Sequence, residues 1–200
     1  MADVGGGNAG HAGFEPDLPI DWLEPDQLGD HLPGRLGLTI LPGKRGISFR
    51  YPGRVYRRDL DDDFARLRSL GVSRLILLVQ DAELRRWSDP GIVASGEAAG
   101  VLVLRHPIPD GQPPASVDEL ARILSEIREG RRTGNVAVAC MGGVGRTGTV
   151  AACALVEGGM TPEDAISVVR AVRHPTAVET DEQERFVRAF ARSRQASGSA

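Results

Sequence analysis

The chain has 200 residues, of which 41% are hydrophobic, 26% charged and 4% aromatic, and its formal net charge is −3. This length and composition fit one globular domain and exclude a second large one. A small negative net charge gives no electrostatic basis for binding nucleic acid or an anionic membrane, because both usually require a basic surface. Two cysteines, Cys140 and Cys153, are too few for a disulfide scaffold.

Membrane and export signals are absent from the sequence. No apolar run approaches the roughly 20 residues that span a bilayer, and the N-terminus has neither the basic region nor the apolar stretch of a signal peptide. No cluster of Cys and His residues has the spacing of metal ligands. We therefore expect a cytoplasmic protein with no membrane partner, no metal and no organic cofactor.

Both ends of the chain are rich in small or polar residues. Residues 2–13 are mostly Gly and Ala, and the last six residues are Gln-Ala-Ser-Gly-Ser-Ala. Such segments have little apolar surface to bury on folding. We expect disordered tails over residues 1–17 and 195–200, and a folded domain over residues 18–194.

Charge is unevenly distributed near the N-terminus. Residues 1–34 contain acids but no Lys or Arg, whereas residues 35–58 contain Lys and Arg but no acids. The simplest interpretation is that the two segments partly neutralise each other on the surface. A second hypothesis is that part of the basic segment borders a site for an anionic substrate, with Arg57 and Arg58 as the residues to test.

Strand and helix signals alternate along the chain. In chain order, we expect a strand over 36–41, a helix over 61–71, a strand over 74–79, a helix over 90–99, a strand over 101–105, a helix over 116–128, a strand over 136–140, a helix starting at 146, a helix over 161–173, and a helix starting at 180. This alternation predicts an α/β fold of three layers, with a mostly parallel central sheet flanked by helices. The near-continuous apolar character of the strands suits a sheet that is covered on both faces.

Local signals mark two of the helix starts. Ser116 followed by Glu119 forms a capping-box pattern, and Gly130 is a typical residue after a helix end. Thr161 precedes a proline and two acids, which are favourable in the first turn of a helix. We therefore place the starts of these two helices at Ser116 and Thr161.

The glycine-rich segment after the last expected strand stands apart from the rest. Val136-Ala-Val-Ala is followed by Cys140-Met-Gly-Gly-Val-Gly-Arg146-Thr-Gly and then by an Ala- and Leu-rich helix. A strand, a glycine-rich turn and a helix N-terminus bring several backbone N–H groups to one place. This arrangement predicts a site for an anion such as phosphate.

Two known nucleotide-binding loops fit this segment less well. A Walker loop requires a lysine before its final Ser or Thr, and the segment has none. Gly143-Val-Gly145-Arg-Thr-Gly148 does match the dinucleotide fingerprint Gly-x-Gly-x-x-Gly. That fingerprint expects a strand after the helix, whereas Gly158-Gly-Met-Thr-Pro-Glu leads into another helix. Dinucleotide binding is therefore the weaker alternative.

The third interpretation, Cys-x5-Arg, accounts for every unusual residue of the segment. A Cys140 thiolate surrounded by N–H groups is stabilised by them and by the helix dipole. The Arg146 guanidinium can donate two parallel hydrogen bonds to a phosphate. The Thr147 hydroxyl can donate to the sulfur and so favour the thiolate as a leaving group. The expected phosphate cradle consists of Met141, Gly142, Gly143, Val144, Gly145 and Arg146.

With these residues the sequence resembles a known family. Cys-x5-Arg-Thr-Gly at a strand–loop–helix junction is the signature of the protein tyrosine and dual-specificity phosphatases. The resemblance implies a general acid on an upstream loop, and His106-Pro-Ile-Pro-Asp110-Gly contains a matching aspartate. Asp110 is thus expected to protonate the leaving oxygen and then, as a carboxylate, to activate water. Cys153, among Ala and Leu on the following helix, is expected to be a packing residue.

Within that superfamily the chain is similar to the kinase-associated phosphatases of the cyclin-dependent kinase inhibitor type. The similar segments span most of the chain: residues 36–44, 70–72, 106–111, 142–146 and 177–183. The resemblance implies the same fold and a cysteine-dependent phosphatase activity.

The chain departs from the family pattern at two positions. The family usually has His before the nucleophile, and Ala139 stands there, so we expect a less acidic Cys140 than in a typical member. The late glutamine that helps to position the hydrolytic water falls on Glu179, with Gln183 four residues later. Gln183 either takes over that function or caps a helix that starts at Thr180.

The composition of the loop also bears on the substrate. Met141 and Val144 bring no lysine into it, which disfavours highly charged substrates such as inositol phospholipids. We expect the partner to be a phosphorylated protein, dephosphorylated at phosphotyrosine or phosphoserine/threonine. Two alternatives stay open. One is a small-molecule or lipid phosphatase with the same mechanism. The other is a phosphate-binding pseudophosphatase, which is considered because Ala139 and Glu179 depart from the family pattern.

Overall fold

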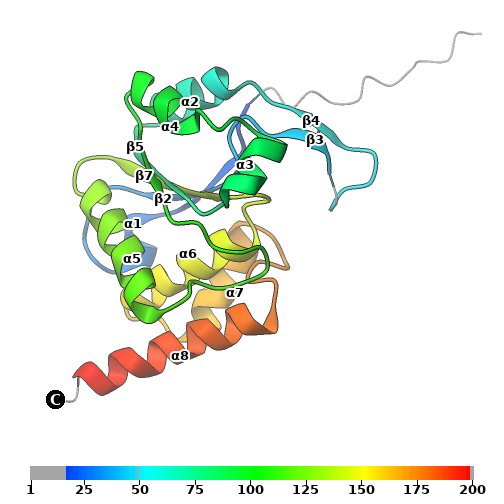
Figure 1. Ribbon diagram of the computed structural model, residues 1–200. Coiled ribbons are helices and arrows are strands. Elements are labelled where there is room, and N and C mark those ends of the chain that lie inside the picture. The colour runs from blue at the N-terminus through cyan, green and yellow to red at the C-terminus, as the bar shows by residue number, and fades with distance from the viewer. Residues whose placement is uncertain (1–16, 49, 199–200) are drawn as a thin grey trace, which may run out of the picture.

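A five-stranded sheet forms the centre of the computed structural model, which describes residues 17–48 and 50–198 (Figure 1). The strands lie in the order β1-β2-β7-β5-β6, and only β1 runs antiparallel to its neighbour. Their bounds are β1 (Ile20–Leu23), β2 (Leu36–Ile40), β5 (Val72–Leu77), β6 (Leu102–Arg105) and β7 (Asn135–Cys140). The predicted α/β fold with a mostly parallel sheet is confirmed.

Helices cover both faces of the sheet and complete the three layers. One face carries α2 (Leu60–Ser69) and α4 (Ile92–Ala98), and the other carries α5 (Val117–Arg131) and α6 (Gly145–Glu157). Helices α7 (Pro162–Val172) and α8 (Asp181–Gly198) pack against α6, and α7 also contacts β1. None of the described helices is both long and apolar enough to cross a bilayer.

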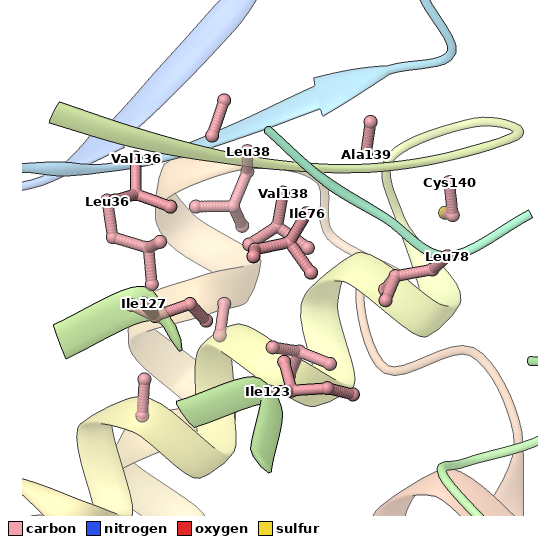
Figure 2. Close-up of a cluster of buried hydrophobic side chains, with 14 of the residues drawn as sticks. Leu36, Leu38, Ile76, Leu78, Ile123, Ile127, Val136, Val138, Ala139 and Cys140 are labelled. Carbon is pink, nitrogen blue, oxygen red and sulfur yellow. The ribbon is translucent and has the colours of Figure 1, made fainter. Parts of the chain in front are cut away.

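The central strand β7 is buried on both faces, which explains its continuous apolar sequence. In Figure 2 the side chains of Val138 and Cys140 lie on the face toward Ile123 and Ile127 of α5, whereas Ala139 points to the opposite face. This alternation follows from the two-residue repeat of a strand. Cys140 is the last residue of the central strand, and the loop to α6 begins directly after it.

The structure contains short elements that the sequence pattern did not predict. These are β1, helices α1 (Pro25–Leu28) and α3 (Asp81–Trp87), and a separate hairpin of β3 (Arg45–Ile47) and β4 (Val55–Arg57). Most side chains of β3 and β4 are exposed, so neither strand has the apolar run that marks a core strand. The alternation that we used detects only elements with a buried face.

The helix starts at Ser116 and Thr161 are confirmed, since each hydroxyl accepts a hydrogen bond from a backbone N–H three residues on, at 3.1 Å. Helix α2 begins earlier than expected because Asp59 caps it. Helix α8 continues to Gly198, beyond the predicted end of the folded domain at residue 194. Residues 1–16 and 199–200 of the expected tails lie outside the described residues.

A buried ion pair joins the end of the β3–β4 hairpin to helix α2. The side chains of Arg58 and Asp63 are 6% and 2% exposed, and Arg58 Nε lies 2.9 Å from Asp63 Oδ2. The same carboxylate accepts the Gly43 N–H at 2.8 Å. Arg58 is therefore committed to the structure, because a buried charge needs its partner.

This arrangement predicts that Asp63→Ala is strongly destabilising. Removing the carboxylate leaves the Arg58 cation buried beside an unsatisfied Gly43 N–H, and we expect a loss of about 3 kcal/mol in the free energy of unfolding. Urea unfolding followed by circular dichroism measures it. The control is Asp62→Ala on the exposed side of the same helix turn, which should cost less than about 1 kcal/mol. Equal losses for the two variants would contradict the assignment.

Candidate active site

The loop between β7 and α6 encloses the thiol of Cys140. Cys140 is 3% exposed, and its sulfur accepts hydrogen bonds from the backbone N–H groups of Val144 and Thr147. Helix α6 starts at Gly145 without a side-chain cap and without an acid in its first turn. The positive end of the helix dipole is therefore directed at the loop with no carboxylate of the first turn to offset it.

The thiol is acidified by its surroundings. Burial raises the pKa of Cys140, but the Arg146 charge and the hydrogen bonds from Thr147 and Val144 lower it by more, so the net pKa is below the ordinary value. The Thr147 hydroxyl is buried, and no nitrogen or oxygen among the described residues pairs with it. Its partner is the Cys140 sulfur, through the side-chain hydrogen bond that helps to lower the pKa of Cys140. Burial raises the pKa of the second thiol, Cys153, which stays neutral.

Two cations from distant segments hold the carbonyl groups of the loop. Arg173 donates from Nε to the Gly143 carbonyl at 2.8 Å and from Nη2 to the Gly142 carbonyl at 3.2 Å. Lys44 Nζ donates to the Met141 carbonyl at 3.0 Å. In a trans peptide the N–H points away from the preceding carbonyl, so these bonds turn the next N–H groups toward the inside of the loop. The Val144 N–H that reaches the sulfur follows the carbonyl of Gly143.

Two glycines allow the loop to pack closely against its neighbours. Gly143 has φ +65°, and a Cβ there would lie 2.3 Å from the Thr39 carbonyl oxygen at the end of β2. A Cβ on Gly145 would lie 2.4 Å from Glu179 Oε2. Any larger residue at either position would have to displace the backbone or a wall of the site.

Arg146 is buried and bound on three sides. Its side chain is 1% exposed. Nη1 donates to Glu83 Oε2 at 2.8 Å and to the Ile108 carbonyl at 2.9 Å, and Nη2 donates to Glu83 Oε1 at 2.7 Å. Burial lowers the pKa of Arg146, but the Glu83 hydrogen bonds and the charges of Cys140 and Asp110 raise it by more, so the guanidinium stays charged.

Asp110 lies where the sequence analysis expected it. It sits on the loop after β6, its side chain is 83% exposed, and Oδ1 is 2.9 Å from Arg146 Nη2. The structure therefore brings the expected nucleophile, phosphate ligand and acid together from three separate segments.

The sequence analysis missed Glu83. This residue lies in the first turn of α3 and accepts the Gln80 N–H at 2.8 Å, while its carboxylate pairs with Arg146. Burial raises the pKa of Glu83, but the hydrogen bonds from Arg146 lower it by more. The Gln80–Glu83 capping pattern could have predicted the helix, but nothing local indicates a partner 63 residues away.

A cavity of about 320 Å³ opens above the loop. Its lining includes seven residues of the expected site: Cys140, Met141, Gly142, Val144, Arg146, Asp110 and Glu179. It also includes Lys44, Arg50, Arg54, Arg173 and His174. The basic segment therefore does border the site, but the residues named for it were wrong. Arg57 is exposed away from the cavity, and Arg58 is bound to Asp63.

Comparison with known proteins identifies the family. Residues 52–160 match the family model described as "Polymorphic toxin system, DSP-PTPase phosphatase". The chain is 30% identical to cyclin-dependent kinase inhibitor 3 of Rattus norvegicus, over 86% of this chain and 78% of that protein. The chain belongs to the dual-specificity and protein tyrosine phosphatase superfamily. It is a cysteine-dependent phosphatase, as the sequence motif predicted.

Solved structures agree with this membership. A crystal structure of kinase associated phosphatase, with its catalytic site cysteine replaced by serine, superposes with a TM-score of 0.78 at 26% identity and covers 92% of this chain and 98% of its own. The active form of Tk-PTP superposes with a TM-score of 0.64 at 31% identity and covers 80% and 94%, respectively. The predicted similarity to the kinase-associated phosphatases is confirmed.

The two positions that depart from the phosphatase pattern have different surroundings. Ala139 is fully buried on the face of β7 opposite Cys140. Glu179 lines the cavity and forms an ion pair with Arg50. Gln183 is fully buried: its Oε1 accepts the Glu179 N–H at 2.8 Å and its Nε2 donates to the Gln112 carbonyl at 3.3 Å.

The surroundings of Gln183 match the helix-capping interpretation in part, because its side chain accepts the N–H of Glu179 rather than that of Thr180. The Thr180 hydroxyl accepts the Gln183 N–H at 3.2 Å, as that interpretation predicts. The same hydroxyl donates to the Gly111 carbonyl at 2.9 Å. Thr180 and Gln183 therefore join the start of α8 to the loop that carries Asp110.

The surroundings of the thiol predict that Thr147→Val raises the pKa of Cys140. Valine has a similar shape but cannot hydrogen bond to the sulfur, so the thiolate loses one stabilising contact. The measurement is the pH midpoint of alkylation by iodoacetamide in a Cys153→Ala background. This midpoint should be higher for Thr147→Val than for the same background with Thr147. Thr149→Val, two residues further along α6, is the control, because the Thr149 hydroxyl donates to the Gly145 carbonyl at 2.9 Å. An unchanged midpoint in Thr147→Val would contradict the assignment.

Lys44 predicts a pH dependence of stability. Burial lowers the pKa of Lys44 from 10.5 to about 8, with Arg50 and Arg173 adding to the effect and Cys140 opposing it. Between pH 8 and pH 10.5 the Lys44 side chain is protonated in the unfolded chain but largely neutral in the folded chain. The contribution of Lys44 to the free energy of unfolding therefore rises with pH. The free energy of unfolding of the unchanged chain, relative to Lys44→Met, should therefore rise by about 3 kcal/mol between pH 7 and pH 11. A constant difference across that range would exclude the effect.

Proposed function

We propose that the protein hydrolyses phosphate monoesters through a phosphocysteine intermediate, with Cys140 as nucleophile, Arg146 and the loop of residues 141–145 as phosphate cradle, and Asp110 as general acid and base. The observation that carries this proposal is the acidified thiol of Cys140, held in one cavity with Arg146 and Asp110. Family membership supplies the reaction class, and these contacts support the assignment of each role.

In the first step the Cys140 sulfur attacks phosphorus opposite the ester oxygen. The S–P bond forms, the P–O ester bond breaks, and Asp110 gives its proton to the departing oxygen. The guanidinium of Arg146 and the inward N–H groups bind the other phosphate oxygens, whose charge moves during the transfer. Glu83 binds both terminal nitrogens of that guanidinium, so Arg146 needs little reorganisation when phosphate arrives.

In the second step water replaces the sulfur. Asp110, now a carboxylate, takes a proton from water, the new O–P bond forms, and the S–P bond breaks to release phosphate and the thiolate. Thr147 assists by donating its hydroxyl to the leaving sulfur, since the same contact that lowers the pKa of Cys140 makes it a better leaving group.

For the residue that positions this water, Glu179 is better placed than Gln183. Glu179 lines the cavity, whereas both ends of the Gln183 amide are bonded to backbone groups. We assign Gln183 to the structure of the α8 start and Glu179 to the water side of the site.

The substrate class that we propose is a phosphorylated protein, at phosphotyrosine or phosphoserine/threonine. Similarity to cyclin-dependent kinase inhibitor 3 and to kinase associated phosphatase supports it. We assign this activity to the domain that starts at residue 18 and includes the core residues up to Ala191 of α8. Both cysteines are free thiols, which fits a reducing cytoplasmic setting.

The proposed mechanism predicts a defined pattern of p-nitrophenyl phosphate hydrolysis. Cys140→Ser should abolish turnover, and Asp110→Asn should lower kcat by about 100-fold or more, because no proton reaches the leaving oxygen. Asp110→Asn should also change the shape of the pH–rate profile, because the variant lacks the general acid. Initial rates between pH 5 and 8 with a chelator present measure both effects.

Matched controls separate these roles from general damage. Cys153→Ala and the exposed Asp118→Asn should keep the turnover of the unchanged chain. Turnover by Cys140→Ser, or its loss on adding the chelator, would contradict the mechanism. A folded but inactive unchanged chain would instead favour phosphate binding without catalysis.

A further inference from the structure

The β3–β4 hairpin forms one wall of the catalytic cavity. The main sheet and its helices supply the loop, Arg146 and Asp110, whereas this small separate sheet supplies most of the opposite side. We call this surface the hairpin wall; it consists of Lys44, Ser48, Arg50, Tyr51, Arg54 and Tyr56. No acid occurs in residues 35–58, so the wall presents only cationic, hydroxyl and aromatic groups.

The cations around the cavity differ in their partners. Arg146 pairs with Glu83 and Asp110, and Arg173 pairs with Asp21 across 2.5 Å. Arg50 pairs with Glu179. These three cations are therefore largely neutralised by carboxylates of the chain itself.

Lys44 has no such carboxylate. It is 8% exposed, and among the described residues its ammonium contacts only the Met141 carbonyl, at 3.0 Å, and the ring of Tyr56. The charge of opposite sign that acts on it is the Cys140 thiolate. A buried cation that no carboxylate pairs with favours binding of a further anion beside it. Lys44 is also the only lysine of the chain.

A second cation converges on the same ring. Lys44 Nζ lies 4.1 Å from the centroid of Tyr56, and Arg54 Cζ lies 5.2 Å from it. Arg54 also lies 5.4 Å from the ring of Tyr51. The rings hold the two cationic groups on the cavity side of the hairpin.

We propose that Lys44 and Arg54, placed around Tyr56, form a second anion subsite that binds an acidic side chain next to the phosphorylated residue of a peptide substrate. This proposal rests on the proposed function, since it assumes that the scissile phosphate occupies the loop of residues 141–145. The subsite selects phosphoproteins with Asp or Glu beside the phosphorylated residue. It replaces the lysine that the loop itself lacks, so the composition of the loop understated the charge of the site.

The experiment compares two phosphotyrosine peptides that differ only by Glu or Gln at the neighbouring positions. For the unchanged chain, kcat/KM should favour the Glu peptide by about fivefold, the value expected for a partly exposed charge pair. Arg54→Gln should bring this ratio close to one, and Arg54→Lys should keep most of it. Arg122→Gln, an exposed arginine on α5 outside the cavity, should keep the full ratio. A ratio near one for the unchanged chain, or an unchanged ratio in Arg54→Gln, would overturn the proposal.

Two further arms test a lipid substrate and the chemical step on its own. Phosphoinositide in phosphatidylcholine vesicles tests a lipid headgroup, and a loss of lipid turnover in Arg54→Gln with an unaltered peptide ratio would overturn the peptide assignment. p-Nitrophenyl phosphate carries no second anion, so its turnover tests the chemistry alone. If that turnover is absent, the proposed function fails.

The subsite can still be tested in that case, by titrating both peptides into Cys140→Ser. Tighter binding of the Glu peptide supports the subsite, and equal binding of the two peptides overturns it.

Discussion

The buried guanidinium of Arg146 is the constraint on which the rest of the site depends. A cation that is 1% exposed is stable only if opposite charges and acceptors surround it. Glu83 supplies a carboxylate from α3, Asp110 supplies one from the loop after β6, and Cys140 supplies a thiolate from the same loop as Arg146. The charged forms stabilise one another: Arg146 lowers the pKa of Cys140 and of Glu83, and they raise that of Arg146. The reactive thiolate is therefore a consequence of how the arginine is buried.

The fold supplies these partners because β7 is the central strand. Its carboxyl end is surrounded by the ends of β2 and β5 and by the segments that follow β5 and β6. Thr39 at the end of β2 contacts Gly143, while the segments after β5 and β6 carry Glu83 and Asp110. On the other side, Arg173 ties the loop to Asp21 of β1. A loop whose N–H groups must converge on one anion is thus held by several elements at once, which keeps it in the binding geometry before phosphate arrives.

The parts of this site that could be predicted from sequence are those whose signal is local. Cys140, the glycines and Arg146 lie within one strand–loop–helix segment, and the hydrophobic runs of β2, β5, β6 and β7 predict the sheet around it. Glu83 and Arg173 could not be found this way, because their hydrogen bonds to the loop cross 63 and 30 residues and leave no periodic trace. Family resemblance rather than pattern located Asp110. The basic segment shows the same limit. The cavity lining agrees with the second hypothesis, that part of this segment borders the site, rather than with the simpler interpretation of surface neutralisation. The hairpin has too little buried apolar surface to predict which of its side chains point toward the cavity.

The catalytic residues and the hairpin wall belong to two separate sheets, so the two can vary independently. The chemistry depends on charges buried between the main sheet and its loops, where altering one partner leaves another charge unpaired. The hairpin wall lies on a separate two-stranded sheet whose strands are mostly exposed and which is anchored at one end by Arg58 and Asp63. Substitutions near Ile47 and Val55, at the exposed part of the hairpin, remove no counter-ion from Arg146 or Cys140. The selectivity of this site can therefore vary with the hairpin while the arginine–thiolate pair and its supporting carboxylates stay fixed.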